Sequence, residues 1–268
     1  MRLLTALPFA LAAVLWQPMA AGGQVCTLPD SVGRALPDSV PSPVPYATIR
    51  DQGVPFSELS LGVGHLRPTD ETWKWEWLTE IALPLSAAPG AAPWGWIARG
   101  WIIDASTGLI APLTVSGLLE TGYEDATFIV MERADDGWLR IRFAPEGSES
   151  DAGTAWVPEC ALAGENVDLH LEMWRDLFLS DRISPLFFRF DVPHVLRSAP
   201  GEDGEGLGVI AGDYHLEPLE VAGDWMRVIV KQPSDSCALD VQPVVKRGWV
   251  RWRSADQGPW VWYHSRGC

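Results

Sequence analysis

Hydrophobic and polar residues alternate along two similar segments of the chain. Residues 136–142 read Asp-Gly-Trp-Leu-Arg-Ile-Arg, and residues 223–230 read Gly-Asp-Trp-Met-Arg-Val-Ile-Val. A second tryptophan segment follows each of them, at 155–158 and at 248–251. Because a period of two places successive side chains on opposite faces of a strand, each segment predicts a turn followed by a β-strand. Their recurrence at domain-sized spacing predicts two copies of one small β-domain.

A third alternating segment carries Trp73, Trp75 and Trp77, separated by Lys74 and Glu76. This pattern predicts a strand with three indoles on one face. Such a face either packs in a core or serves as a binding platform, because indole rings bury large apolar areas and also stack on ligands. Both alternatives remain open at this point.

Composition favours short strands over long helices. The 268 residues include 25 glycines, 22 prolines and 15 tryptophans, so strands ended by turns are expected. One short helix is predicted, because residues 171–178 carry apolar side chains at positions i, i+3, i+6 and i+7 ahead of Pro185. The sequence therefore predicts an all-β fold of two tandem domains joined by a short helix.

The first 45 residues are predicted to lie outside both domains. Residues 1–22 begin with Arg2, continue as an interrupted apolar run and end in small residues, as secretory signal peptides do. The run is shorter than the roughly 20 apolar residues of a membrane span, so we expect cleavage and no stable membrane insertion. Residues 23–45 are predicted to form a proline-rich arm. The two domains are then assigned to residues 46–165 and 166–268.

Charge narrows the range of partners. The chain has 35 acidic and 20 basic residues, a formal net charge of −15. Polyanions are repelled by such a chain, so nucleic acid and anionic lipid are excluded as expected partners. Cationic, neutral-sugar and peptide ligands stay open.

The chain contains four cysteines, Cys26, Cys160, Cys237 and Cys268, with no Cys-x-x-Cys pair. An even number in an exported chain predicts two disulfides rather than free thiols or a metal site. Three connectivities are open. We favour Cys237 with Cys268 inside the second copy, which leaves Cys26 to tie the arm to Cys160.

The second copy contains four segments in a recognisable order. They are Val-Leu-Arg-Ser-Ala-Pro-Gly at 195–201, an acidic glycine turn at 202–205, Gly-Asp-Trp at 223–225 and Gly-Trp-Val at 248–250. Over residues 194–253 the chain resembles the bacterial SH3-like domain family, whose members begin with an Arg-Ser-x-Pro segment and end with Gly-Trp strands. The first copy matches less well, since Leu-Ser-Ala-Ala-Pro-Gly at 85–90 lacks the arginine and Ala155 replaces a glycine.

The resemblance implies two small SH3-like barrels in tandem and a cell-wall peptide or another envelope ligand. Carried over residue by residue, it makes Tyr214, Trp225 and Trp249 the ligand-binding candidates of the second copy. Each of them is equally suited to the core, because a barrel of this size must bury its indoles.

Chemistry-bearing motifs are sparse, and no catalytic motif is found. Asp-x-His-x-Glu occurs at 168–172 and at 213–217, where a strand would direct the three polar groups to one face. That face is either a metal-ligand set or an ordinary solvated surface. The acidic turns at 146–151 and 202–205 suggest either calcium ligands or solvated turns. Neither turn follows the spacing of a specific calcium-binding loop, which favours solvated turns.

The sequence therefore predicts a non-enzymatic, exported binding module of the cell envelope, periplasmic or extracellular, with neither cofactor nor metal. Its expected partner is a cell-wall peptide or an envelope protein. One competing hypothesis is a metal-dependent envelope enzyme that uses His170 or His215 with the neighbouring carboxylates. Another is a purely structural interaction subunit. The sequence leaves the oligomeric state open.

Overall fold

A computed structural model describes most of the chain beyond its N-terminal region. The described residues are 26–34, 61–108, 110–114, 118–122, 125–145, 153–183, 185–188, 193–233, 242–254 and 258–263. The predicted signal peptide, most of the predicted arm, Cys237, Cys268 and the acidic turn at 146–151 lie outside them.

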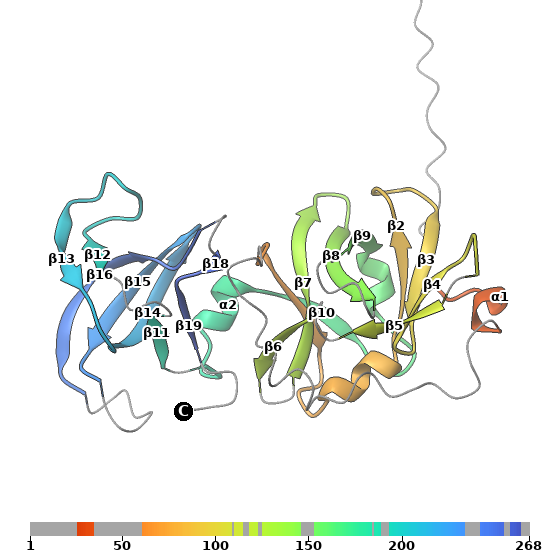
Figure 1. The fold of residues 1–268 in the computed structure, drawn as a ribbon, viewed down its shortest axis with the longest axis horizontal. Coiled ribbons are helices and arrows are strands. Elements are labelled where there is room, and N and C mark those ends of the chain that lie inside the picture. The colour runs from red at the N-terminus through yellow and green to blue at the C-terminus, as the bar shows by residue number, and fades with distance from the viewer. Residues whose placement is uncertain are drawn as a thin grey trace, which may run out of the picture.

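The predicted all-β fold is confirmed, since two large antiparallel sheets account for most described residues (Figure 1). The ten-stranded sheet contains β1 (Gly64–Pro68), β2 (Ala82–Ser86), β3 (Pro93–Ala98), β4 (Trp101–Asp104), β5 (Ile110–Thr114), β6 (Leu119–Gly122), β7 (Asp125–Ala134), β8 (Trp138–Pro145), β9 (Gly153–Pro158) and β10 (Leu169–Met173). The seven-stranded sheet contains β11 (Leu186–Phe188), β12 (His194–Arg197), β13 (Gly206–Ile210), β14 (His215–Ala222), β15 (Trp225–Lys231), β16 (Val244–Arg251) and β19 (Val261–Tyr263). A small ribbon pairs β17 (Arg253–Ser254) with β18 (Gly258–Pro259).

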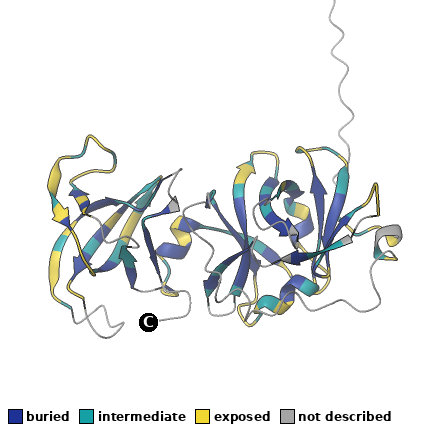
Figure 2. Ribbon diagram, in the orientation of Figure 1, coloured by how far each residue is buried: buried dark blue, intermediate teal, exposed yellow. Residues whose placement is uncertain are grey.

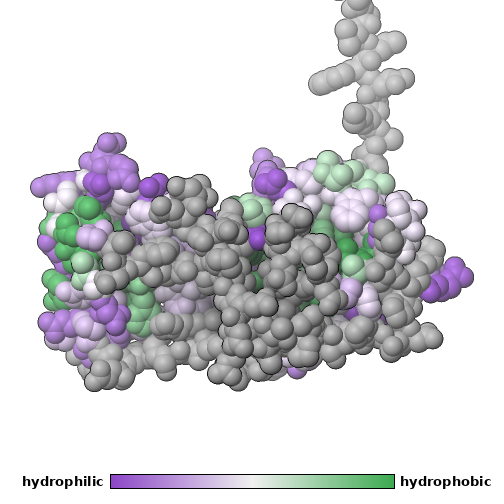
Figure 3. Space-filling model, in the orientation of Figure 1, coloured by the Kyte–Doolittle hydropathy of each residue, from purple (hydrophilic) through white to green (hydrophobic). Residues whose placement is uncertain are grey.

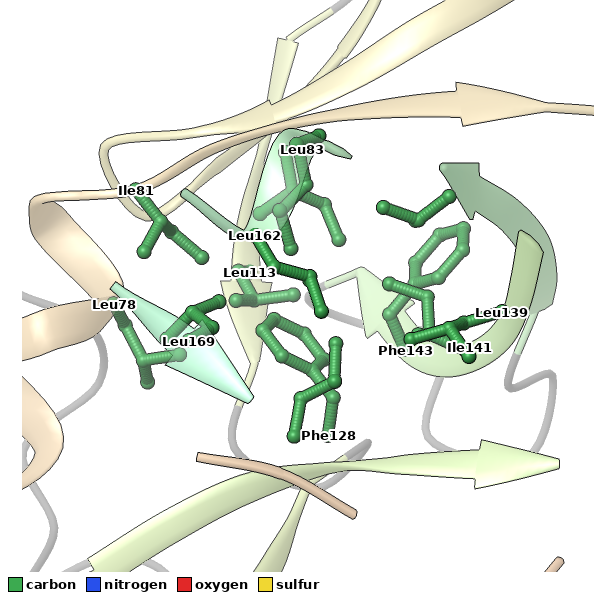
Figure 4. Packing of buried hydrophobic residues seen from close by; sticks show 14 of the residues in the cluster. Leu78, Ile81, Leu83, Leu113, Phe128, Leu139, Ile141, Phe143, Leu162 and Leu169 are labelled. Carbon is green, nitrogen blue, oxygen red and sulfur yellow. The ribbon is translucent and has the colours of Figure 1, made fainter. Parts of the chain in front are cut away.

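The ten-stranded sheet curls on itself. Its strand order is β10-β1-β7-β8-β5-β4-β3-β2-β9, with β6 on β7, and β9 pairs in addition with β8. The strands from β8 round to β9 therefore form a closed ring. Inward side chains of several strands meet in its core, where Leu83, Phe128, Ile141 and Phe143 approach one another (Figure 4).

Both predicted turn-and-tryptophan strands are present. Strand β8 begins at Trp138 directly after Gly137, and β15 begins at Trp225 two residues after Gly223. Both glycines have positive φ, 79° and 59°, which L-residues with a Cβ adopt reluctantly in tight hairpin turns.

The seven-stranded sheet has the order β13-β12-β16-β15-β14-β11-β19. One face carries a second core, in which Met226, Val228 and Val250 are fully buried. The same core includes Leu61 and Ile129 from the side of the ten-stranded sheet, and α2 (Trp174–Phe178) lies between the sheets (Figure 1). Figure 2 shows buried residues along this seam. Both sheets thus contribute residues to one hydrophobic cluster, which joins them.

The predicted strand through Trp73, Trp75 and Trp77 is wrong. Residues Trp75–Thr79 form a 3-10 helix, η3, so the three indoles do not share a face. Trp77 is fully buried and donates its indole N–H to the Ala126 carbonyl at 3.1 Å, whereas Trp75 is partly exposed. Burial of one large ring decides the local conformation here, which the binary pattern did not reveal.

The predicted helix at 171–178 is present only in its second half. Residues 169–173 form β10, which pairs with β1 in the ten-stranded sheet, and α2 occupies only Trp174–Phe178. The edge of β1 offers backbone partners to residues 169–173, so sheet pairing replaces the first helical turn. The stretch just after residue 165, which we assigned to the second domain, therefore adds a strand to the first sheet.

The predicted bond between Cys26 and Cys160 is present, with 5.8 Å between the Cα atoms. It attaches residues 26–34, which include α1 (Asp30–Gly33), to η5 (Glu159–Leu162). Leu28 packs against a small cluster that contains Trp96 and Ile103. Among the described residues, no helix is long and apolar enough to cross a bilayer.

Candidate functional site

Trp225 and Trp249 lie on the face of the seven-stranded sheet that is turned away from its core. In the register of β15 and β16, Trp225 pairs with Arg251 and Arg227 pairs with Trp249. Directly paired residues of an antiparallel sheet point to the same face, and the intervening residues point to the opposite one. Those intervening residues include Met226, which belongs to the core. The outer face therefore carries two indoles interleaved with arginines, of which Trp225 is partly exposed and Trp249 is buried at 7% exposure.

We call this surface the Trp/Arg face and define it by Arg197, Trp225, Arg227, Arg247, Trp249 and Arg251. Arg197 joins it because its Cα partner on β16 is Trp249. Arg247 joins it because it pairs with Ile229, two residues after Arg227 on β15. Strands β12, β15 and β16 thus bring together residues that are up to 54 positions apart in the sequence.

Arginine side chains lie over one aromatic ring in this sheet, Trp225, and one just before β19, Trp260. The Arg197 guanidinium lies 5.8 Å from the centroid of Trp225, and that of Arg251 lies 5.9 Å from the centroid of Trp260. These are cation–π distances, which orient the planar guanidinium groups and leave their edges available for hydrogen bonds.

Acidic residues neutralise only part of the charge on this face. Glu202 lies 2.7 Å from Arg197 and 3.5 Å from Arg251, and Glu220 lies 3.4 Å from Arg227. Within the described part of the chain, Arg247 makes neither an ion pair nor a hydrogen bond and is exposed. Four arginines thus face two carboxylates, which makes a locally cationic surface on a chain of net charge −15.

The acidic turn at 202–205 is occupied by these arginine contacts. Arg197 also donates to the carbonyls of Glu202 and Gly204, at 2.7 Å and 2.9 Å. The turn therefore fixes the Arg197 side chain, and these contacts give the arginine of the Arg-Ser-Ala-Pro segment a structural role.

Exposed aliphatic side chains extend the Trp/Arg face towards the sheet edge. Val195 lies two residues before Arg197 on β12 and pairs with Val209 on β13, which is 61% exposed. Figure 3 shows hydrophobic surface at this end of the molecule, where Figure 1 places β13. The edge itself is protected, because β13 contains a bulge and Lys246 donates to the Leu207 carbonyl.

The three ligand-binding candidates do not lie together. Tyr214 packs against the core of the seven-stranded sheet, on the other side from Trp225 and Trp249. Arg227, Arg247 and Arg251 were not among the candidates predicted from the sequence. Their signal was available as alternation of arginine with tryptophan along β15 and β16, and only the strand register turns that alternation into one surface.

A second group of polar residues is buried at the seam between the sheets. His65 is fully buried, stacks on Trp174 at 4.9 Å, and its Nε2 lies 2.9 Å from Glu172 Oε2. Burial lowers the pKa of His65 below its usual 6.5, although the Glu172 carboxylate opposes the shift. Arg67 and Arg182 also contact Glu172, so the carboxylate is held by cations on several sides.

Burial also shifts the pKa of two further seam residues. Burial raises the pKa of Asp125, and it raises the pKa of the Tyr263 hydroxyl well above 10.0. That hydroxyl donates to the Thr121 carbonyl at 2.9 Å, which ties β19 to the ten-stranded sheet. The seam group therefore acts in packing the two sheets together.

Neither Asp-x-His-x-Glu segment assembles a metal site. In the first, Glu172 is committed to His65 and to the guanidinium groups of Arg67 and Arg182. In the second, His215 is buried edge-on against Phe187, contrary to the solvated strand considered above, and Glu217 pairs with Lys231 at 2.6 Å. Among the described residues, no group of three or more His, Cys, Asp or Glu side chains could hold a metal ion.

Comparison with known proteins gives little that bears on this site. No protein-family model matches the chain. No curated protein matches it either. One of the solved structures that the chain matches is a crystal structure of Ly7917, at 15% identity over 62% of this chain and 67% of the other, with a TM-score of 0.16. Another is Ly7917 with the hydrolyzing product of MDP, at 13% identity over 79% of this chain and 97% of the other, with a TM-score of 0.18.

These matches correct one prediction. The expectation that the chain is not an enzyme rested on missing motifs, and it is withdrawn because a matched structure holds a hydrolysis product. TM-scores this low carry no argument about a reaction of this chain. The site is therefore defined by its own geometry, as a cationic and aromatic sheet face bordered by exposed valines.

Proposed function

We propose that the chain is an exported binding module of the cell envelope and that the Trp/Arg face takes an anionic ligand with apolar or ring-shaped parts, such as a carboxylate-bearing cell-wall peptide. The proposal includes the assignment of tandem SH3-like barrels, which the resemblance of residues 194–253 supports. The observation that carries it is the alignment of Trp225 and Trp249 with four arginines on one outward sheet face.

The chemistry of the face suits such a ligand. A guanidinium offers paired N–H donors that match a carboxylate, and stacking on an indole holds that fork in place. Arg247, without a partner in the described part of the chain, is ready to pair with a ligand carboxylate. The partly exposed ring of Trp225 and the exposed side chains of Val195 and Val209 add apolar contact that a purely ionic site would lack.

The overall charge restricts the ligand further. A chain of net charge −15 repels long polyanions at distances beyond the local patch. A ligand with isolated carboxylates on an otherwise neutral backbone avoids that repulsion. Short wall peptides have this character, and nucleic acids do not.

Sedimentation with isolated peptidoglycan, at low salt and neutral pH, tests the proposal. We expect the protein to pellet with the wall material, and we expect Arg247→Glu and Trp225→Ala each to reduce the bound fraction. Arg175→Glu is the matched charge control, because Arg175 is exposed on α2, away from the Trp/Arg face. Absence of wall retention in the unaltered protein, or equal losses in Arg247→Glu and Arg175→Glu, would sink the proposal.

An envelope protein is the second candidate ligand of the same face. The exposed pair Val195 and Val209 favours it, because apolar side chains next to arginines are typical of protein interfaces. Capture of one envelope protein by the unaltered chain but not by Val209→Asp, without retention on peptidoglycan, would support this interaction role instead.

A further inference from the structure

We infer that a cavity at the other end of the molecule is a second binding site, for a small zwitterion of dipeptide size. The cavity has a volume of about 300 Å³ and lies where the disulfide-linked N-terminal segment meets the ten-stranded sheet. This is the lower end of the range of ligand sites, roughly 300–1,000 Å³. The inference is independent of the Trp/Arg face.

Opposite charges line this cavity. Arg99, in the turn between β3 and β4, supplies a guanidinium, while Glu80 and Glu165 supply carboxylates. Within the described part of the chain, the Arg99 side chain makes neither a hydrogen bond nor an ion pair. A ligand with a carboxylate at one end and an ammonium at the other would pair with both kinds of group.

Arg99 is held in a conformation that its residue type disfavours. Its φ is 51° and that of Gly100 is 79°, so both central residues of this hairpin turn have positive φ. Asn, Asp and Gly are the residues preferred there. The backbone N–H of Arg99 donates to the Ile81 carbonyl at 3.1 Å, which fixes the turn against β2. A non-glycine residue at positive φ, with an unpaired guanidinium beside a cavity, is typical of a functional side chain.

The acidic side of the cavity is also positioned. Glu80 follows η3, and its Oε2 accepts a hydrogen bond from Asn166 Nδ2 at 3.0 Å. This bond joins residues that are 86 positions apart and aligns one carboxylate oxygen. The remaining acceptor capacity of Glu80 is available for a ligand ammonium.

The rest of the lining combines small apolar groups with the polar residues Thr27, Thr79 and Asn166. Ala82, Ala161 and Ala163 border the cavity together with Leu28 and Cys26. The alanine methyl groups offer apolar contact to small side chains of a ligand. An alanine-sized dipeptide with free ends therefore matches both the charge pattern and the space.

Isothermal titration of the full chain, with its disulfide intact, tests the inference with alanyl-alanine as the probe. We expect saturable binding that weakens about tenfold or more when the probe is N-acetylated or C-amidated, because each change removes one charged end. Arg99→Gln should abolish binding to the free dipeptide, and Glu80→Gln should weaken it. Arg175→Gln, on exposed α2, should bind as the unaltered protein does.

Arg99→Gly separates a lost site from a damaged fold. Glycine relieves the positive φ, so this variant should melt about 2–4 °C higher and yet fail to bind the dipeptide. No heat of binding up to about 10 mM dipeptide, equal binding of the capped probes, or unchanged affinity in Arg99→Gly would each overturn the inference.

Discussion

The seam between the two sheets gives the sharpest stability prediction, through Trp174→Phe. Trp174 is buried in the shared core and donates its indole N–H to the Leu61 carbonyl at 2.6 Å. It also stacks on His65 and meets Trp262 edge-on at 5.7 Å. Phenylalanine keeps an aromatic ring but removes the donor and part of the buried volume.

The magnitude follows from those two losses. A buried carbonyl left without its donor costs about 1–3 kcal/mol. The smaller ring leaves a void that costs about 1 kcal/mol more, since the packed surroundings relax only partly. We therefore expect the free energy of unfolding to fall by about 2–4 kcal/mol. Trp225→Phe is the matched control, because Trp225 lies on the outer face, and it should change stability by only about 0.5 kcal/mol.

Urea denaturation followed by far-UV circular dichroism and by fluorescence measures the effect. Because residues of both sheets share one core, both probes should report a single transition that moves as a whole in Trp174→Phe. Two separate transitions, with only one shifted by the substitution, would refute the argument that the seam couples the sheets. So would equal shifts in Trp174→Phe and Trp225→Phe.

Three further predictions concern other parts of the fold. The double variant Cys26→Ser/Cys160→Ser should have a free energy of unfolding lower by up to about 5 kcal/mol, because the bond closes a loop of 134 residues in the unfolded chain. An unchanged melting temperature in thermal unfolding would contradict this. The low pKa of His65 means that the unfolded chain binds more protons, so stability should fall as the pH drops below 6.5, and His65→Gln should flatten that slope in denaturation series. Gly248→Ala should lower the free energy of unfolding, measured by urea titration, by about 1–3 kcal/mol, because its Cβ would lie 2.7 Å from Leu196 Cγ. Gly137→Ala is the control, because a Cβ there has no neighbour within 4 Å and only the positive φ contributes.

Gly248 illustrates what the sequence could predict and what required the structure. The Gly-Trp-Val segment was recognisable as a strand, but the reason for its glycine is the approach of Leu196 from β12. Likewise, the pairing of Cys26 with Cys160 was one of three open connectivities until the segment around Leu28 was placed on the ten-stranded sheet.

Local patterns determined the β class and the start of β8 and β15, because alternation and turn glycines act within a few residues. They did not determine where an indole points. Trp138 and Trp225 occupy matching places in their segments, yet Trp138 is buried at 4% exposure and Trp225 lies on the outer face. The difference arises from which neighbouring strands and layers cover each ring.

The sequence by itself thus determined an all-β chain with repeated tryptophan strands and a bond from Cys26 among the candidates. Only the tertiary structure decided that Trp77 of η3 is buried in a core, that arginines from three strands lie around Trp249, and that Arg99 and Glu80 line the same cavity. The physical reason is that such juxtapositions depend on strand register and on the packing of one sheet against another, to which residues far apart in the chain contribute together.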